Sequence, residues 1–117
     1  MDYKVGGIIF NYDNEYVLAQ IIDGKYHPFY PNINLPDKYH PLLSIIKGFY
    51  DEFGEHLSCW SHIIKYNNCD YYKISVDLEY YYRNLDHNYD VININDINDL
   101  DCDNIFKELI FKISSKK

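Results

Sequence analysis

Apolar positions along the chain recur with two different periods, and each period predicts a type of element. Residues 3–10 and 15–22 are apolar, β-branched runs separated by the turn-rich tetrapeptide "NYDN", which predicts a β-hairpin. Residues 58–66 and 71–82 predict two further strands around the turn "NNCD". In the second of them apolar and polar side chains alternate, as in a half-buried strand. Residues 89–95, "YDVININ", predict one more short strand.

Helical spacing occurs twice. One apolar face is formed by Leu42, Leu43, Ile45, Ile46, Phe49 and Phe53. Pro41 suits the first turn of this helix, and Gly54 is a natural stop. A last helix, capped by Asp103, carries a stripe of Ile105, Phe106, Leu109, Ile110 and Ile113. Between the first strands and the first helix, residues 23–41 hold all four prolines and predict a long loop with at most one short strand. The order β-β-loop-α-β-β-β-α predicts a single α+β domain over residues 1–117, with residues 113–117 as a frayed tail.

Composition and charge narrow the possible partners. The 117 residues carry a net charge of −7, with 18 acidic and 11 basic side chains, which disfavours long nucleic acid as a ligand. No apolar run reaches the roughly 18 to 20 residues of a membrane span, and the first ten residues lack a signal-peptide pattern. Three cysteines without a CxxC pair predict a reducing, cytoplasmic setting. The abundance of Tyr, Ile and Asn suggests an AT-rich genome such as that of a virus or phage, in which case the setting is the host cytoplasm.

Three carboxylates gather at the end of the first predicted helix, around Gly54. They are Asp51, Glu52 and Glu55, in the stretch "SIIKGFYDEFGEHL". The end of a helix carries partial negative charge, so acids there are mildly unfavourable unless a cation sits beside them. Positions 48, 51, 52 and 55 fall on one face of a continuous helix, which places the three acids together. They are either a solvated helix end or a metal site, and Lys47 is spaced to pair with Asp51 on the surface.

A second set of residues has zinc-like spacing. It consists of His56, Cys59, His62 and Cys69, residue types that occur in tetrahedral zinc sites. In a strand, however, an offset of three puts Cys59 and His62 on opposite faces, so Cys59 is expected to be a small buried residue. The tyrosine clusters at 71–72 and 80–82 either stack on a base or form half-buried sheet surface.

The order of elements, together with several motifs, resembles the Nudix superfamily. The stretch "VGGIIFNYDNEYVLAQ" is similar to the family's opening strand pair, and "NLPDKYHP" to its Leu-Pro-Gly-Gly segment. The stretch "IIKGFYDEFG" is similar to the signature Arg-Glu-U-x-Glu-Glu-x-Gly, where U is a bulky apolar residue. The strings "YYKISVDLEYYY" and "YDVININDINDL" resemble a later strand and the closing strand with its acidic loop. The resemblance implies a mixed β-sheet packed between helices.

The resemblance also implies roles for individual residues. It places Asp51 and Glu52 at the paired acids that act in catalysis and bind Mg²⁺ or Mn²⁺. Glu55 is a candidate third metal ligand, because Gly48 falls on the glutamate that normally supplies one. Lys47 falls on the arginine of the motif, and Lys38 and Tyr39 stand in the loop before the helix. These three are expected to contact a nucleotide-type ligand. Counted from Pro36, that loop is about five residues short of the full motif Gly-x5-Glu-x7-Arg-Glu-U-x-Glu-Glu-x-Gly-U.

Three functions follow from these observations. The first is a Nudix-fold protein with a degenerate catalytic motif that binds a nucleotide-type ligand or a protein partner and hydrolyses weakly or not at all. The second is an active, divergent pyrophosphohydrolase dependent on Mg²⁺ or Mn²⁺. The third is an unrelated α+β interaction module. Outside the second, no cofactor is expected, and a homodimer is compatible with each.

Overall fold

The computed structural model describes residues 4–32, 36, 40–79 and 87–114. Its strands are β1 (Val5–Asn11), β2 (Tyr16–Ile22), β3 (Lys25–His27), β4 (Trp60–Tyr66), β5 (Cys69–Val76) and β6 (Tyr89–Asn93). Its helices are α1 (Pro41–Phe53), the 3-10 helix η1 (Ile94–Asp99) and α3 (Asn104–Ser114). Every element predicted from the apolar pattern is present. The helix α3 extends to Ser114, past the point where a frayed tail was expected to begin.

The six strands form one mixed sheet in the order β3-β2-β1-β5-β4, with β6 paired to β2. The two strands β1 and β5 run parallel over their whole length, from Val5 beside Asp70 to Asn11 beside Val76. The other pairings are antiparallel. The predicted hairpin is β1–β2, and its turn is closed by Asn14 in a left-handed conformation.

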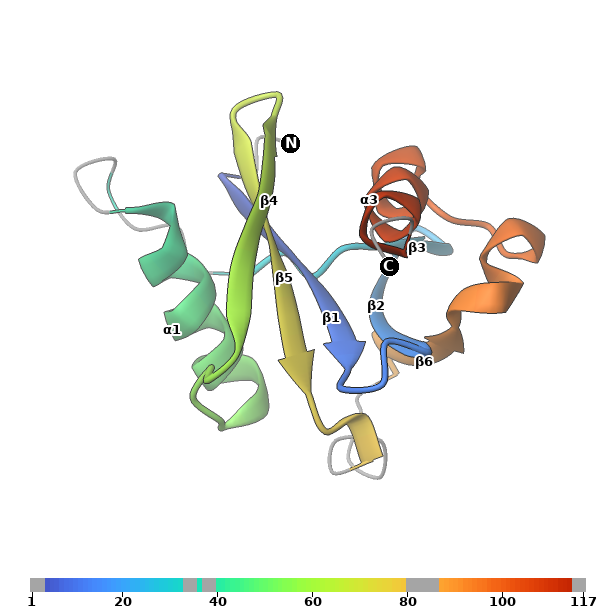
Figure 1. The fold of residues 1–117 in the computed structure, drawn as a ribbon. Helices are drawn as coiled ribbons and strands as arrows, with labels where there is room; N and C mark the ends of the chain where they lie inside the picture. The colour runs from blue at the N-terminus through green and yellow to red at the C-terminus, as the bar shows by residue number, and fades with distance from the viewer. Residues whose placement is uncertain (1–3, 33–35, 37–39, 80–86, 115–117) are drawn as a thin grey trace.

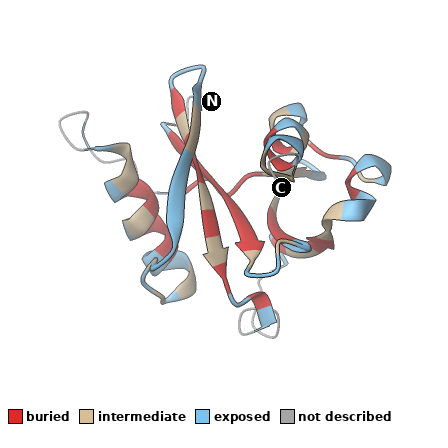
Figure 2. Ribbon diagram, viewed as in Figure 1, coloured by how far each residue is buried: buried red, intermediate tan, exposed pale blue. Residues whose placement is uncertain are grey.

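Helices cover both faces of this sheet (Figure 1). On β1, Val5 and Ile9 belong to the core on the α1 side, whereas Ile8 and Phe10 belong to the core on the α3 side. Since both faces of β1 are buried, its sequence is a continuous apolar run rather than an alternating one. Burial is concentrated in β1 and β5, and it decreases toward the outer strand β4 (Figure 2). The sheet packed between helices confirms the predicted fold.

The helix α1 begins and ends where its sequence signals predicted. The Leu42 N–H donates to Nδ1 of His40 at 3.2 Å, so His40 caps the first turn, and Pro41 follows it. At the other end Gly54 has a φ of 74° and donates its N–H to the Tyr50 carbonyl at 2.8 Å. A left-handed residue of this kind ends a helix.

Several predicted strand boundaries were wrong: β1 ends at Asn11 rather than at residue 10, β5 begins at Cys69 rather than at residue 71, and β6 ends at Asn93 rather than at residue 95. The fourth strand begins at Trp60 rather than at residue 58, and Cys59, expected to be buried, is exposed. The fifth strand ends at Val76, because the side chain of Asp77 accepts the Glu79 N–H at 3.1 Å and starts a turn instead. Among the residues that the structure describes, no helix has the length and apolar character needed to cross a membrane.

Candidate functional site

The paired acids lie on the exposed last turns of α1. Both Asp51 and Glu52 are exposed, and Oδ2 of Asp51 is 3.6 Å from Nζ of Lys47. The two side chains of this ion pair are 44% and 55% exposed. Such a surface pair stabilises a helix by about 0.3–0.5 kcal/mol. Lys47 therefore lies beside Asp51, one of the predicted metal ligands. Metal binding by Asp51 and Glu52 and nucleotide contact by Lys47 stay predictions.

Glu55 does not continue the face that carries Asp51 and Glu52. The prediction that places it one turn beyond Asp51 requires a helix through residue 55, but α1 ends at Phe53. Because Gly54 is left-handed, the chain leaves the helix axis before Glu55, which is half-buried. Within the described ranges, no three side chains of His, Cys, Asp or Glu come together as metal ligands. Asp51, Glu52 and Glu55 therefore do not converge on one point in this structure.

The position of the missing fourth acid, Gly48, is filled by a neighbouring loop. A Cβ atom built on Gly48 would lie 2.2 Å from Cβ of Pro31 and 3.2 Å from its Cα. Real carbon atoms in contact are separated by about 3.5–4 Å. Gly48 and Pro31 are both buried, so the proline ring occupies the space into which a glutamate side chain would extend.

The proline that contacts α1 is not Pro36, at which the Leu-Pro-Gly-Gly resemblance was drawn. Pro36 is exposed, and Pro31 is the proline that packs on the helix. Counting the motif's own spacing back from Gly54 without a gap places Leu-Pro-Gly-Gly on residues 30–33, with Pro31 at its proline. This spacing is a signal in the sequence that points to Pro31 rather than to the Leu-Pro string at residues 35–36. The expected ligand contacts Lys38 and Tyr39 lie outside the described residues.

The segment just before Pro31 is hydrogen-bonded to the two strands β1 and β2. Phe29 exchanges two backbone hydrogen bonds with Gly7, both 2.8 Å long. The Tyr30 N–H donates to the side-chain oxygen of Gln20 at 2.9 Å. These bonds hold the segment that carries Pro31 against β1 and β2, so the contact with Gly48 rests on a fixed backbone.

The residues of the zinc-like set are separated in the fold. The set consists of His56, Cys59, His62 and Cys69. The His62 Nε2 atom pairs with Oδ1 of Asp70 at 3.0 Å, whereas Cys69 is buried in the core on the α3 side. Cys59 is exposed just before β4 begins. No tetrahedral arrangement of these four residues is formed.

Buried thiol and phenol groups are held in their protonated forms. Burial raises the pKa of Cys69 from its ordinary 9.0 to about 11. Burial, followed by the hydrogen bond between the Tyr30 and Tyr71 hydroxyls at 2.9 Å, raises the pKa of Tyr71. Burial also raises the pKa of Cys102. A thiol acts as a nucleophile in its thiolate form, so these shifts do not favour catalysis by either cysteine.

Besides a smaller hollow of about 290 Å³, two larger concave regions lie in the described part of the molecule. One, of about 530 Å³, lies beyond the ends of β1 and β5 and is lined by Asn11, Asp13, Tyr16, Asp77, Leu78, Glu79 and Val91. The other, of about 600 Å³, lies between the start of α1 and the strands β4 and β5. It is lined by His40, Leu42, Trp60, His62, Asp70 and Tyr72. The acids predicted for catalysis, Asp51 and Glu52, line neither of them.

Comparison with known proteins identifies the fold. No family model and no curated protein sequence matches the chain. Among solved structures, a MutT protein from work on Aliivibrio salmonicida and Vibrio cholerae is 15% identical, with a TM-score of 0.62 over 91% of this chain and 92% of that one. A complex of Caenorhabditis elegans Ap4A hydrolase is 13% identical, also with a TM-score of 0.62, over 96% of both chains. These proteins are Nudix hydrolases, and the chain has the Nudix fold, as the resemblance implied.

Proposed function

We propose that this chain is a Nudix-fold protein that binds a nucleotide-type ligand and hydrolyses it weakly or not at all. The observation that carries the proposal is the contact between Gly48 and Pro31. Hydrolysis of a diphosphate by metal catalysis needs carboxylates that hold the cation against the phosphates. The helix position that would supply one of them here has no side chain and no room for one.

The remaining acids are a sparse set for this chemistry. Mg²⁺ is a hard cation that takes oxygen ligands, and it commonly binds one or two carboxylates together with substrate phosphates. Asp51 and Glu52 would be those carboxylates, but both are exposed and Asp51 is paired with Lys47. A metal held only by this pair would bind weakly and without the enclosure that strengthens electrostatic catalysis. This supports binding over turnover.

The binding half of the proposal is supported by the fold and by the second concave region. Ligand sites are concave, mostly apolar and supplied with a few polar groups, and the region lined by Trp60, Tyr72 and His62 has this character. The net charge of −7 favours a small ligand over long nucleic acid. The solved structures that share this fold include a hydrolase named for a dinucleotide, Ap4A.

The test combines a stability measurement with a turnover measurement on the same compounds. The purified chain is incubated with nucleotides, dinucleotides and nucleoside-diphosphate-linked compounds, with Mg²⁺ or Mn²⁺, and products are separated chromatographically. We expect at least one compound to raise the melting temperature without being consumed. A ligand at 100 times its Kd stabilises the folded state by about 2.7 kcal/mol, which a thermal scan resolves readily.

Variants of the acids separate the alternatives. Asp51→Asn and Glu52→Gln are compared with Glu108→Gln, which changes an exposed acid on α3. If the chain shows metal-dependent turnover that both site variants abolish and Glu108→Gln leaves intact, it is an active hydrolase. The proposal that it hydrolyses its ligand weakly or not at all would then be wrong. If no compound raises the melting temperature, nucleotide binding is wrong and a protein partner becomes the better hypothesis.

A further inference from the structure

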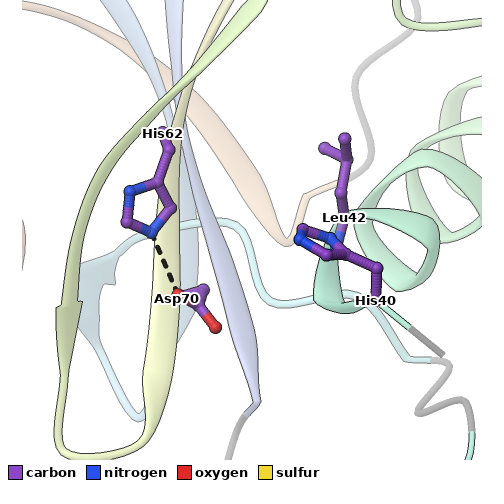
Figure 3. A network of polar contacts seen from close by, with 4 residues as sticks. All are labelled: His40, Leu42, His62 and Asp70. Atoms are coloured by element: carbon purple, nitrogen blue, oxygen red, sulfur yellow. Dashed lines mark hydrogen bonds and ion pairs between the residues drawn. The ribbon is translucent and has the colours of Figure 1, made fainter. Parts of the chain in front are cut away.

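The concave region beside the start of α1 has two walls of different origin. One wall is the face of β4 and β5 that carries Trp60, His62, Asp70 and Tyr72, and the other is the first turn of α1, with His40 and Leu42. Figure 3 shows His62 and Asp70 on the strands and His40 across from them on the helix. We call this region the α1–β4 cleft.

The aromatic groups of the cleft are fixed by the sheet. Trp60 and His62 are two apart on β4, so their side chains lie on the same face. Both rings stand nearly perpendicular to the Tyr72 ring, at 6.4 Å and 79° for Trp60 and 5.1 Å and 77° for His62. Tyr72 is only 2% exposed, whereas Trp60 is 46% exposed. The cleft therefore presents a large indole surface on a rigid base.

The polar groups of the cleft are placed beside this aromatic surface. Oδ1 of Asp70 is 3.0 Å from Nε2 of His62, and the Asp70 side chain is 15% exposed. A carboxylate has a second oxygen that accepts hydrogen bonds, and in Figure 3 the other ring nitrogen of His62 points away from Asp70. Across the cleft, Nδ1 of His40 accepts the Leu42 N–H, which leaves its Nε2 as the remaining polar atom of the ring.

We propose that the α1–β4 cleft is a subsite for a planar, amino-bearing heteroaromatic ring, the chemistry of a nucleobase such as adenine. The ring packs against Trp60, and its amino group donates a hydrogen bond to Asp70. This inference deepens the proposed function and rests on it. The carboxylate of Asp70 accepts from the amino group of the base, and its negative charge repels phosphates. The base therefore enters the cleft, and the phosphates stay outside.

The cleft suits this ligand better than it suits a metal or an anion. Two imidazoles and one carboxylate line it, and in the described ranges no three ligating side chains converge on one point. Among the described residues that line it there is no lysine or arginine to compensate the charge of a phosphate.

Trp60 is the only tryptophan of the chain, so its fluorescence reports on this cleft alone. Adenosine, which has no phosphate, is titrated into the native protein while indole emission is followed. We expect a saturable change in emission. Purine riboside, in which a hydrogen replaces the amino group, is expected to bind about tenfold more weakly, since its base offers Asp70 no N–H donor. In Asp70→Leu, whose side chain has no acceptor, the two nucleosides are expected to bind with similar affinity.

Trp60→Leu is compared with the control Tyr66→Leu. Each removes a half-exposed aromatic side chain from β4, but Tyr66 lies outside the cleft. Measured by calorimetry, Trp60→Leu is expected to weaken adenosine binding about 5- to 150-fold, while Tyr66→Leu leaves it unchanged. A ligand could instead raise the melting temperature without changing Trp60 emission, and do so equally in Trp60→Leu. That result would show that the base does not bind in the α1–β4 cleft, while the proposed nucleotide binding would stand. If no nucleoside or nucleotide changes either emission or melting temperature, the proposed function fails as well.

Discussion

Replacing Gly48 with alanine tests whether the loop at Pro31 closes the helix position where the family motif has an acid. In an exposed helix this substitution would stabilise the fold by about 1 kcal/mol, because alanine loses less backbone entropy on folding. At Gly48 the added methyl group meets Pro31, with its Cβ at 2.2 Å from the proline Cβ and 3.2 Å from its Cα. The two effects have opposite signs.

The magnitudes favour destabilisation. Forcing one extra methyl into a filled core costs about 1–3 kcal/mol. The cost is at the upper end here, because the second atom in contact belongs to the backbone, and the loop is held by the Phe29–Gly7 hydrogen bonds and by Gln20. After subtracting the helix gain, we expect Gly48→Ala to lower the free energy of unfolding by about 1–2 kcal/mol.

Urea unfolding of a double-mutant cycle measures this directly. Pro31→Gly removes the atom that clashes, so Gly48→Ala in the Pro31→Gly background is expected to be neutral or stabilising. The coupling energy between the two sites should then exceed 1 kcal/mol, within the range found for residues in contact. If Gly48→Ala changes the free energy of unfolding in neither background, the loop at Pro31 moves aside easily. The contact with Pro31 would then not prevent a glutamate side chain at position 48.

Three further predictions concern thiols and core packing. In the folded protein Cys59 should react quickly with Ellman's reagent, and Cys69 and Cys102 only after unfolding; three fast thiols would contradict the burial. Because burial raises the pKa of Cys69 to about 11, the thiol loses its proton at a lower pH in the unfolded chain than in the folded one. The free energy of unfolding should therefore fall as pH rises from about 9 to 11. If this pH dependence is unchanged in Cys69→Ala, Cys69 is not its cause. Phe29→Ala should cost about 3–5 kcal/mol in urea unfolding and Tyr66→Ala under about 0.5; equal losses would refute the core assignment.

Those parts of the fold that depend on nearby residues could be predicted from the sequence. Helix α1 follows from the spacing of Ile45 and Phe49 and from the signals at Pro41 and Gly54, all of which act within one or two turns. The strands follow from their apolar runs, but their ends do not. Asp77 ends β5 with a side-chain hydrogen bond that competes with the ladder, and period alone does not reveal such competition.

The candidate site depended on contacts between distant segments, so less of it could be predicted. The sequence gives the positions of Asp51, Glu52 and Gly48, but it does not state which loop lies against the helix. Pro31 reaches Gly48 because Phe29 bridges to β1 far along the chain. His62 and Asp70 meet across two strands whose register is set by a turn and by a bulge after His62. Spacing rules apply to a single element and do not identify such neighbours.

The parallel pairing of β1 with β5 has a consequence for how the chain folds. Val5 pairs beside Asp70, so the central contact of the sheet joins segments about 65 residues apart, and closing so long a loop is slow. The β4–β5 hairpin needs no such search, because Asn67 and Asn68, with φ of 49° and 63°, form its two-residue turn. We therefore expect the hairpin to form within microseconds and to wait for β1, whose docking beside β5 sets the folding rate.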